Sequence, residues 1–158
     1  MIVRSKAPLR LGLAGGGTDV SPYSDLYGGC ILNATINLYA RASITENEKE
    51  IVIQASDIGL KETYPIQKNL PINKKLDLAK GVYNRLVNEF DLQPRGFHIN
   101  TFVEAPPGSG LGSSSTLVVA ILGAFVEWLK LPLGEYDIAR LAYSIEREDL
   151  ALAGGKQD

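Results

Sequence analysis

The chain has 158 residues, of which 45% are hydrophobic and 22% charged, and its formal net charge is −2. This composition is typical of a globular chain long enough to bury one core, without the basic footprint of a nucleic-acid-binding protein. No apolar run reaches the roughly 18 to 20 residues of a membrane span, so neither nucleic acid nor a membrane is predicted as a partner. A single cysteine, Cys30, and a single histidine, His98, exclude an internal disulfide and a thiolate or imidazole metal centre.

Hydrophobic periodicity divides the chain into strand-like and helix-like segments. Strands are predicted over residues 2–6, 10–14, 30–45 with a break, 50–56 and 96–104. Helices are predicted over residues 19–27, 76–90, 113–130 and 135–150. Several strands followed by helices that cross their face favour an α+β architecture, a mixed sheet with helices packed on it.

The most informative segment, residues 106–115, lies between the last predicted strand and the longest predicted helix and reads Pro-Pro-Gly-Ser-Gly-Leu-Gly-Ser-Ser-Ser. Glycines at alternate positions allow positive φ angles and a close approach of the backbone to an anion, and a helix start offers unpaired N–H groups. Serine hydroxyls add donors to phosphate oxygens or a ligand for Mg²⁺. A Gly/Ser linker is the alternative, but linkers rarely run straight into a helix start. The position therefore predicts a phosphate-binding site.

This loop lacks the Lys-Ser or Lys-Thr pair of a Walker A loop and the glycine spacing of the dinucleotide fingerprint. It resembles the second motif of the GHMP kinases (the galactokinase, homoserine kinase, mevalonate kinase and phosphomevalonate kinase superfamily), Pro-x-Gly-x-Gly-Leu-Gly-Ser-Ser-Ala, with Ser115 in place of the alanine. The resemblance implies a domain similar to ribosomal protein S5 domain 2. It also implies ATP binding by Pro107, Gly108, Ser109, Gly110, Leu111, Gly112, Ser113 and Ser114.

A second match lies at residues 7–19, which read Ala-Pro-Leu-Arg-Leu-Gly-Leu-Ala-Gly-Gly-Gly-Thr-Asp. It is similar to the family's first motif, in which a strand carrying Ala-Pro-x-Arg leads into a turn and Thr-Asp. Leu9 and the three glycines depart from the galactokinase form of this motif. Without the family, the glycines mark a tight turn, either purely structural or with room for a ligand. The resemblance implies that Arg10 offsets charge at the reacting oxygen and that the sugar is contacted by Gly16, Gly17, Thr18 and Asp19.

A third match lies at the carboxyl end, where Glu146 on the last predicted helix is followed by Gly154-Gly155-Lys156-Gln157-Asp158. Alone, Glu146 could belong to a solvated face of alternating charges. Its spacing to Asp158 is that of the family, in which a helix glutamate binds Mg²⁺ and an aspartate after a glycine turn is the catalytic carboxylate. The resemblance therefore implies that Ser114 and Glu146 hold Mg²⁺ and that Asp158 orients the attacking hydroxyl.

Taken together, the motifs imply a cytoplasmic enzyme that transfers the γ-phosphoryl group of ATP to a small-molecule sugar phosphate. They are most similar to those of kinases acting on the anomeric hydroxyl of D-glycero-D-manno-heptose 7-phosphate. L-Fucose kinases share the pattern, and an L-fucose kinase or another GHMP kinase of small molecules is the first alternative. A nucleotide-binding module without catalysis is an alternative of another class.

The length of the chain bears on its domain organisation. GHMP kinases are usually about twice as long, so the resemblance implies that residues 1–158 form an incomplete amino-terminal domain that binds ATP and sugar, without the carboxy-terminal GHMP domain. We expect this piece alone to be weakly active or inactive. An apolar groove left open where a second domain normally packs would favour a homodimer.

Overall fold

In residues 1–157, which the computed structural model describes, the fold is built on a five-stranded mixed sheet. The strand order is β1-β2-β5-β3-β4, with β3 parallel to β5 and the other neighbours antiparallel. The strands are β1 (Ile2–Ala14), β2 (Leu32–Glu46), β3 (Ile51–Ala55), β4 (Leu60–Tyr64) and β5 (Phe97–Val103). The mixed sheet with helices on it confirms the predicted α+β class.

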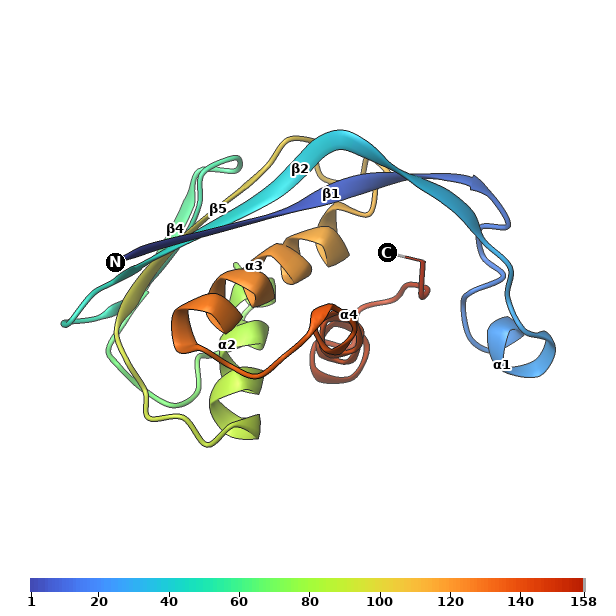
Figure 1. Ribbon diagram of the computed structural model, residues 1–158. Helices are drawn as coiled ribbons and strands as arrows, with labels where there is room; N and C mark the ends of the chain where they lie inside the picture. The colour runs from blue at the N-terminus through green and yellow to red at the C-terminus, as the bar shows by residue number, and fades with distance from the viewer. Residues whose placement is uncertain (158) are drawn as a thin grey trace.

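The helices lie on one face of this sheet (Figure 1). They are α2 (Asp77–Glu89), α3 (Ser113–Leu129) and α4 (Glu135–Ser144), and α4 continues into one turn of π-helix, η1 (Ile145–Asp149). The short helix α1 (Tyr23–Tyr27) lies apart, at the far end of β1 and β2 (Figure 1). The single helix predicted over 135–150 is therefore two elements, and the turn that differs from an α-helix carries Glu146.

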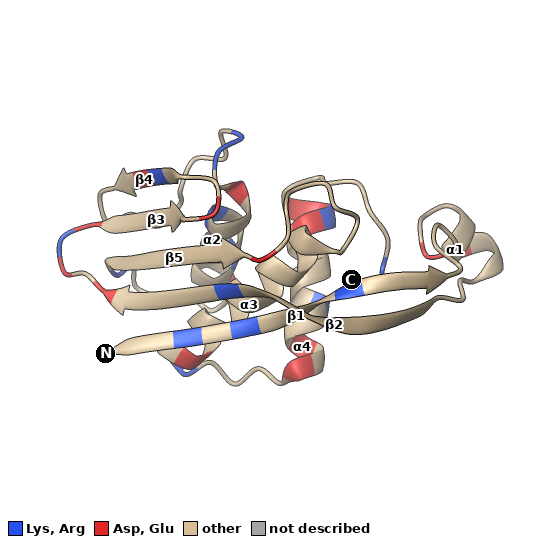
Figure 2. Cartoon of the chain, turned by 90° about the horizontal axis from the view of Figure 1, so that it is seen from above, with Lys and Arg blue, Asp and Glu red and all other residues tan. Residues whose placement is uncertain are grey.

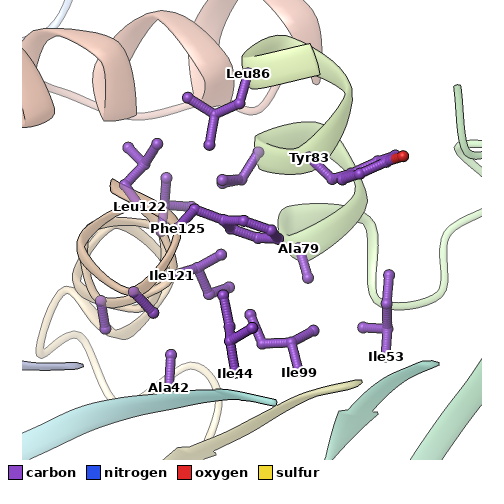
Figure 3. Close-up of a cluster of buried hydrophobic side chains, with 14 of the residues drawn as sticks. Ala42, Ile44, Ile53, Ala79, Tyr83, Leu86, Ile99, Ile121, Leu122 and Phe125 are labelled. Carbon is purple, nitrogen blue, oxygen red and sulfur yellow. The ribbon is translucent and has the colours of Figure 1, made fainter. Parts of the chain in front are cut away.

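The hydrophobic core lies between the sheet, α2 and α3, where the side chains drawn in Figure 3 converge. Strand residues Ile44 and Ile99 point towards Ile121 and Phe125 of α3, and all four are at most 1% exposed. The rings of Phe97 and Phe125 meet edge to face at 5.1 Å between centroids. Each such side chain contributes about 1.5–3 kcal/mol through burial. The body of α3 is thus fixed on the sheet, and with it the position of its first turn.

Three strand predictions were wrong in detail. β2 runs from Leu32 to Glu46 without the break expected within residues 30–45. The segments 2–6 and 10–14 form one continuous strand, β1, whose pairing with β2 shifts in register between Pro8 and Arg10. β4 was missed because it is a short edge strand of mainly polar residues, with no apolar alternation to mark it. It pairs only with β3 among the described strands, after a turn in which Gly59 has a φ of 67°.

The helix predicted over residues 19–27 is also shorter than expected. Only Tyr23–Tyr27 is helical, with Pro22 at the N-cap position. A proline disfavours the helical conformation of the residue before it, so Ser21 could not extend the helix towards Asp19. Residues 15–20 instead form the turns that close the β1–β2 ribbon.

The helix-free face of the sheet is polar and basic. Arg4, Lys6 and Arg41 line a 440 Å³ pocket there, with Asn100 and Phe102. Figure 2 shows basic residues along β1 and β2, whereas acidic residues gather on the helical side around α4. These three cations therefore lie on the face of the sheet opposite α3.

Candidate functional site

The segment between β5 and α3 is an open glycine loop. Gly108, Gly110 and Gly112 have φ angles of 78°, 74° and 73°, which residues with side chains adopt at a cost. A Cβ atom added at Gly108 or Gly110 would meet nothing within 4 Å. The glycines are thus required by backbone conformation, and their bare backbone faces open space.

The helix that follows, α3, begins without a side-chain cap for its first N–H groups. Gly112, at the N-cap position of α3, has no side chain to cap the helix, and the hydrogen bond from Thr116 N–H to the Gly112 carbonyl closes the first turn. The N–H groups of Ser113, Ser114 and Ser115 therefore have no carbonyl to bond within the helix. Together with the positive end of the helix dipole, they suit an anion such as a phosphate. The predicted segment from Pro107 to Ser114 is thus brought together as one cradle, and its donors fit the triphosphate of a nucleotide.

Arg10 holds this loop to the sheet. Its Nη1 atom donates to the Gly110 carbonyl at 2.6 Å, and its backbone N–H donates to the Leu111 carbonyl at 3.1 Å. Leu111 also packs against the core. The structure therefore brings the first and second motifs into direct contact through Arg10. The catalytic role predicted for Arg10 stays a prediction.

Ser114 and Glu146 meet beside the loop. The Ser114 hydroxyl donates to Glu146 Oε1 at 2.5 Å, and the Glu146 residue is 2% exposed. Glu146 lies in η1, where the Leu150 N–H bonds the Ile145 carbonyl, and single π turns within helices are frequent at functional sites. A hydroxyl and a carboxylate at this distance are hard oxygen donors that fit Mg²⁺, which typically takes one or two protein carboxylates and completes its shell with phosphates and water. Within residues 1–157, no cluster of three or more Asp, Glu, His or Cys side chains is arranged to hold a metal ion.

Asp19, for which a sugar contact is predicted, docks the carboxyl-terminal segment through one carboxylate oxygen, and its contact with a sugar stays a prediction. It is 6% exposed, and its Oδ2 atom accepts the N–H groups of Lys156 at 2.7 Å and Gln157 at 3.1 Å. Burial raises the pKa of Asp19, but these and neighbouring backbone N–H groups outweigh it, so the pKa is lowered. Asn33 on β2 adds a hydrogen bond to the Gln157 carbonyl at 3.0 Å. The segment leading to residue 158 is thus held against the end of β1, while Asp158 itself lies outside the described residues.

The hydroxyl of Thr18 is likewise engaged within the protein. It donates to the Gly15 carbonyl at 2.7 Å and accepts from the Cys30 N–H at 3.1 Å, which ties the turn after β1 to the residues before β2. Gly16 and Gly17, by contrast, have nothing within 4 Å of an added Cβ. The backbone of these two glycines is therefore the part of the predicted sugar site that faces open space.

Gly15 is the glycine of this turn that has no room for a side chain. Its φ is 78°, and a Cβ would lie 1.9 Å from the Cys30 carbonyl oxygen. We expect Gly15→Ala to lower the free energy of unfolding by about 3 kcal/mol or more, because conformational strain and a backbone clash add. Gly17→Ala is the matched control, since its φ is 91° but its surroundings are open, and we expect a cost of about 1–2 kcal/mol. Urea unfolding of the two variants measures the difference, and equal losses would contradict the clash.

An apolar pocket next to Ser114 was not predicted from the sequence. It has a volume of 430 Å³, and its wall is made of side chains from β3, α3, the start of α2 and the loops before and after, including Ile53, Ala55, Ile58, Leu76, Leu117 and Ile121. Asp57 and Lys74 add charges to its lining. No sequence pattern marks it, because its residues come from separate elements that meet only in the folded chain.

The glycine loop and the uncapped helix suit an anion, and the adjoining Ser114–Glu146 pair suits a hard cation. Residues 77–158 match the family described as GHMP kinases N terminal domain. The chain therefore belongs to the GHMP kinases, as its motifs predicted.

Among individual relatives, the chain is 50% identical over 157 residues to the D-glycero-alpha-D-manno-heptose 7-phosphate kinase of Campylobacter jejuni, covering 99% of this chain and 46% of the relative. It superposes with a TM-score of 0.95 and 60% identity on a crystal structure of a D-glycero-D-manno-heptose 1-phosphate kinase from Bacteroides thetaiotaomicron, covering 100% of this chain and 52% of that one. The chain thus spans about half the length of these relatives. A galactokinase from Lactococcus lactis, 20% identical with a TM-score of 0.83 over 99% of this chain and 40% of its own, shares the fold.

Proposed function

We propose that the protein transfers the γ-phosphoryl group of ATP to the anomeric hydroxyl of D-glycero-D-manno-heptose 7-phosphate. The observation that carries the proposal is the contact between the exposed Ser114 and the buried Glu146, which lies where an open glycine loop meets an uncapped helix. Phosphoryl transfer requires alignment and neutralisation of charge more than covalent help from the protein. This geometry offers both.

The nucleotide is proposed to occupy two adjoining parts of the site. The N–H groups of the glycine loop and of the first turn of α3 bind the triphosphate, and no P-loop lysine is then required. The 430 Å³ apolar pocket takes the base, because Ser114 contributes both to its lining and to the helix start. A flat aromatic base gains affinity from such an apolar wall.

Ser114 and Glu146 would hold Mg²⁺, which when bound neutralises the negative charge that develops on the phosphates. The short hydrogen bond between the two side chains holds the Ser114 hydroxyl and one Glu146 oxygen side by side. Because Glu146 is buried, its charge is screened little by water. Its other oxygen lies 3.9 Å from Arg147 Nη2, so the carboxylate would be shared between this guanidinium and the metal ion.

On the acceptor side, the protein has to hold one sugar hydroxyl in line with the phosphates. By its match to the family motif, Asp158 is proposed to orient this hydroxyl and to accept its proton. Arg10, already joined to the loop at Gly110, places positive charge between the two motifs. The open backbone of Gly16 and Gly17 is proposed to contact the sugar.

A heptose phosphate is favoured as acceptor by the names of two relatives that are 50% and 60% identical to this chain over the aligned residues. Their names place the phosphate of the heptose at different positions, 7 and 1, and the 7-phosphate leaves the anomeric hydroxyl free to react. A phosphate on the acceptor needs cationic partners. Arg140, Arg147 and Lys156 line a 380 Å³ pocket together with Glu146, so positive charge is available next to the proposed metal site.

The test is to incubate the full-length protein with Mg-ATP and a panel of sugars and sugar phosphates, followed by phosphorus NMR. We expect a new anomeric phosphate resonance with heptose 7-phosphate. Faster phosphorylation of L-fucose would assign the protein to the fucose kinases, one of which, from Bacteroides fragilis, is 27% identical over 180 residues. Nucleotide binding without any phosphorylated sugar would instead identify a non-catalytic module.

A further inference from the structure

Lys80 in α2 is a fully buried lysine, 0% exposed, that the proposed reaction does not use. Its Nζ atom donates to Glu62 Oε2 at 2.9 Å and to Asn73 Oδ1 at 2.5 Å, and it lies 3.2 Å from Asp77 Oδ1. The Tyr64 hydroxyl lies 3.5 Å away. The ammonium group therefore joins β4, the loop before α2 and the first turn of α2.

A buried ion cluster of this kind is weak evidence for stability alone. Removing a charge from water is costly, and well-packed apolar residues often serve a core as well or better. Burial lowers the pKa of Lys80, but its bonds to Glu62 and Asp77 and the neighbouring charges outweigh burial and raise the pKa, so the lysine is charged at neutral pH. The positions of its partners indicate that the charge of Lys80 holds the loop before α2 in place.

Those partners hold the loop before α2 in a strained conformation. Lys74 and Leu76 have φ angles of 69° and 52°, although neither is glycine. Such residues persist only where the surroundings hold them. Asp77 accepts the N–H groups of Asn73 at 3.1 Å and Lys74 at 2.8 Å, and Lys80 in turn bonds both Asn73 and Asp77.

The same loop forms one wall of the apolar pocket beside Ser114. Lys74, Leu76 and Asp77 line the pocket, and Leu117 of α3 lies in its lining as well. The glycine loop, in contrast, is held by Arg10 and by the core, whereas the described polar contacts of Lys80 lie with β4, Asn73 and Asp77. A change at Lys80 should therefore alter the base pocket and leave the phosphate cradle in place.

We propose that Lys80 is a positioning residue, which through Asn73 and Asp77 fixes the 73–77 loop as a wall of the base pocket and so gives the site its preference for a nucleotide over a bare triphosphate. This inference rests on the proposed function, because it takes the pocket to be the site of the base. It assigns Lys80 no contact with any ligand.

The test measures dissociation constants for ATP and for inorganic tripolyphosphate, both with Mg²⁺, by calorimetry on the full-length protein. We expect Lys80→Met to raise the dissociation constant for ATP at least tenfold while that for tripolyphosphate stays within twofold. Lys75→Met is the matched control, because Lys75 is an exposed lysine of the same loop whose side chain does not line the pocket. It should leave both constants unchanged.

Lys80→Met leaves Glu62 and Asp77 without their cation and can fail to fold, so Asn73→Ala is the second variant. It removes one contact between the loop and Lys80 and keeps both carboxylates, and it should weaken ATP binding selectively by about three- to tenfold. If the wild-type protein binds neither ligand, the proposed function fails, and this inference with it. If the wild type binds ATP and the folded variants bind it equally well, or lose both ligands equally, the inference alone is overturned.

Discussion

Replacing Glu146 with glutamine is expected to lower kcat for sugar phosphorylation by about 10²–10³-fold, the range typical of removing one preorganised electrostatic group from an active site. The glutamine keeps the size of the side chain and one oxygen for the Ser114 hydroxyl. It removes the buried negative charge that would hold the cation. The Mg²⁺ concentration that gives half-maximal rate should rise together with the fall in kcat. Steady-state kinetics over a magnesium titration measure both.

Glu148→Gln is the control for this result. Glu148 lies in the same π turn, but its side chain is 68% exposed and accepts a hydrogen bond from Ser144 at 2.6 Å. We expect its kcat to stay within twofold of the wild type. A Glu146→Gln enzyme with normal kcat and normal magnesium dependence would remove the Ser114–Glu146 pair from the mechanism.

The second large effect is expected at Asp19, through the carboxyl-terminal segment that it docks. Asp19→Asn replaces a charged acceptor of the Lys156 and Gln157 N–H groups by an amide, and a hydrogen bond to a buried charged group is worth about 1.5–3 kcal/mol. The segment leading to residue 158 should then loosen. Because misplacement of a catalytic group by a fraction of an ångström costs rate steeply, we expect kcat to fall by about 10²-fold.

Loosening can be measured apart from activity. Trypsin cleaves after lysine, and Lys156 lies in the docked segment, so Asp19→Asn should speed cleavage at that bond. Asp25→Asn is the control, since Asp25 is half exposed and approaches the same lysine only through an ion pair of 3.7 Å. It should change neither cleavage nor kcat appreciably. Normal cleavage and normal kcat in Asp19→Asn would show that the segment is held by other contacts.

Acidification should reproduce the effect of this substitution. The folded-state pKa of Asp19 is lowered, so its contribution to stability is complete above the pKa of an unfolded aspartate and is lost as the pH falls through the lowered value. Cleavage at Lys156 by an acid-tolerant protease would therefore rise towards low pH in the wild type and change less in Asp19→Asn. A flat profile in the wild type would argue against docking by the carboxylate.

The parts of the site that could be predicted from sequence are those encoded by contiguous residues. The glycine loop and the start of α3 follow one another directly in the chain. The flexible glycines, the serine hydroxyls and the free N–H groups of a helix start could therefore be recognised together as a phosphate-binding site. The pairing of Ser114 with Glu146 came from the family spacing, and the structure brings these two side chains into contact. The predicted roles of Arg10 and Asp158 stay predictions.

The parts that could not be predicted depend on contacts between distant segments. The hydrogen bonds that join Asp19 to Lys156 and Thr18 to Cys30 link residues that only the fold brings together. The sugar contacts that the family motif implies for Thr18 and Asp19 stay predictions. The base pocket combines strand, helix and loop residues that share no spacing. Lys80 appeared in sequence as an ordinary helix lysine, and only the packing of β4 against the start of α2 shows its burial.

The bond from Arg10 to the Gly110 carbonyl has a mechanical consequence. The strand that leads to the proposed sugar-binding turn is tethered by one guanidinium to the loop that would grip the nucleotide. The proposed binding sites of the nucleotide and of the sugar are thus joined by direct contacts, so we expect the two sites to move together. In the proposed reaction, the spacing between sugar and nucleotide would then be set, before either binds, by the chain and by the two hydrogen bonds that join Arg10 to Gly110 and Leu111.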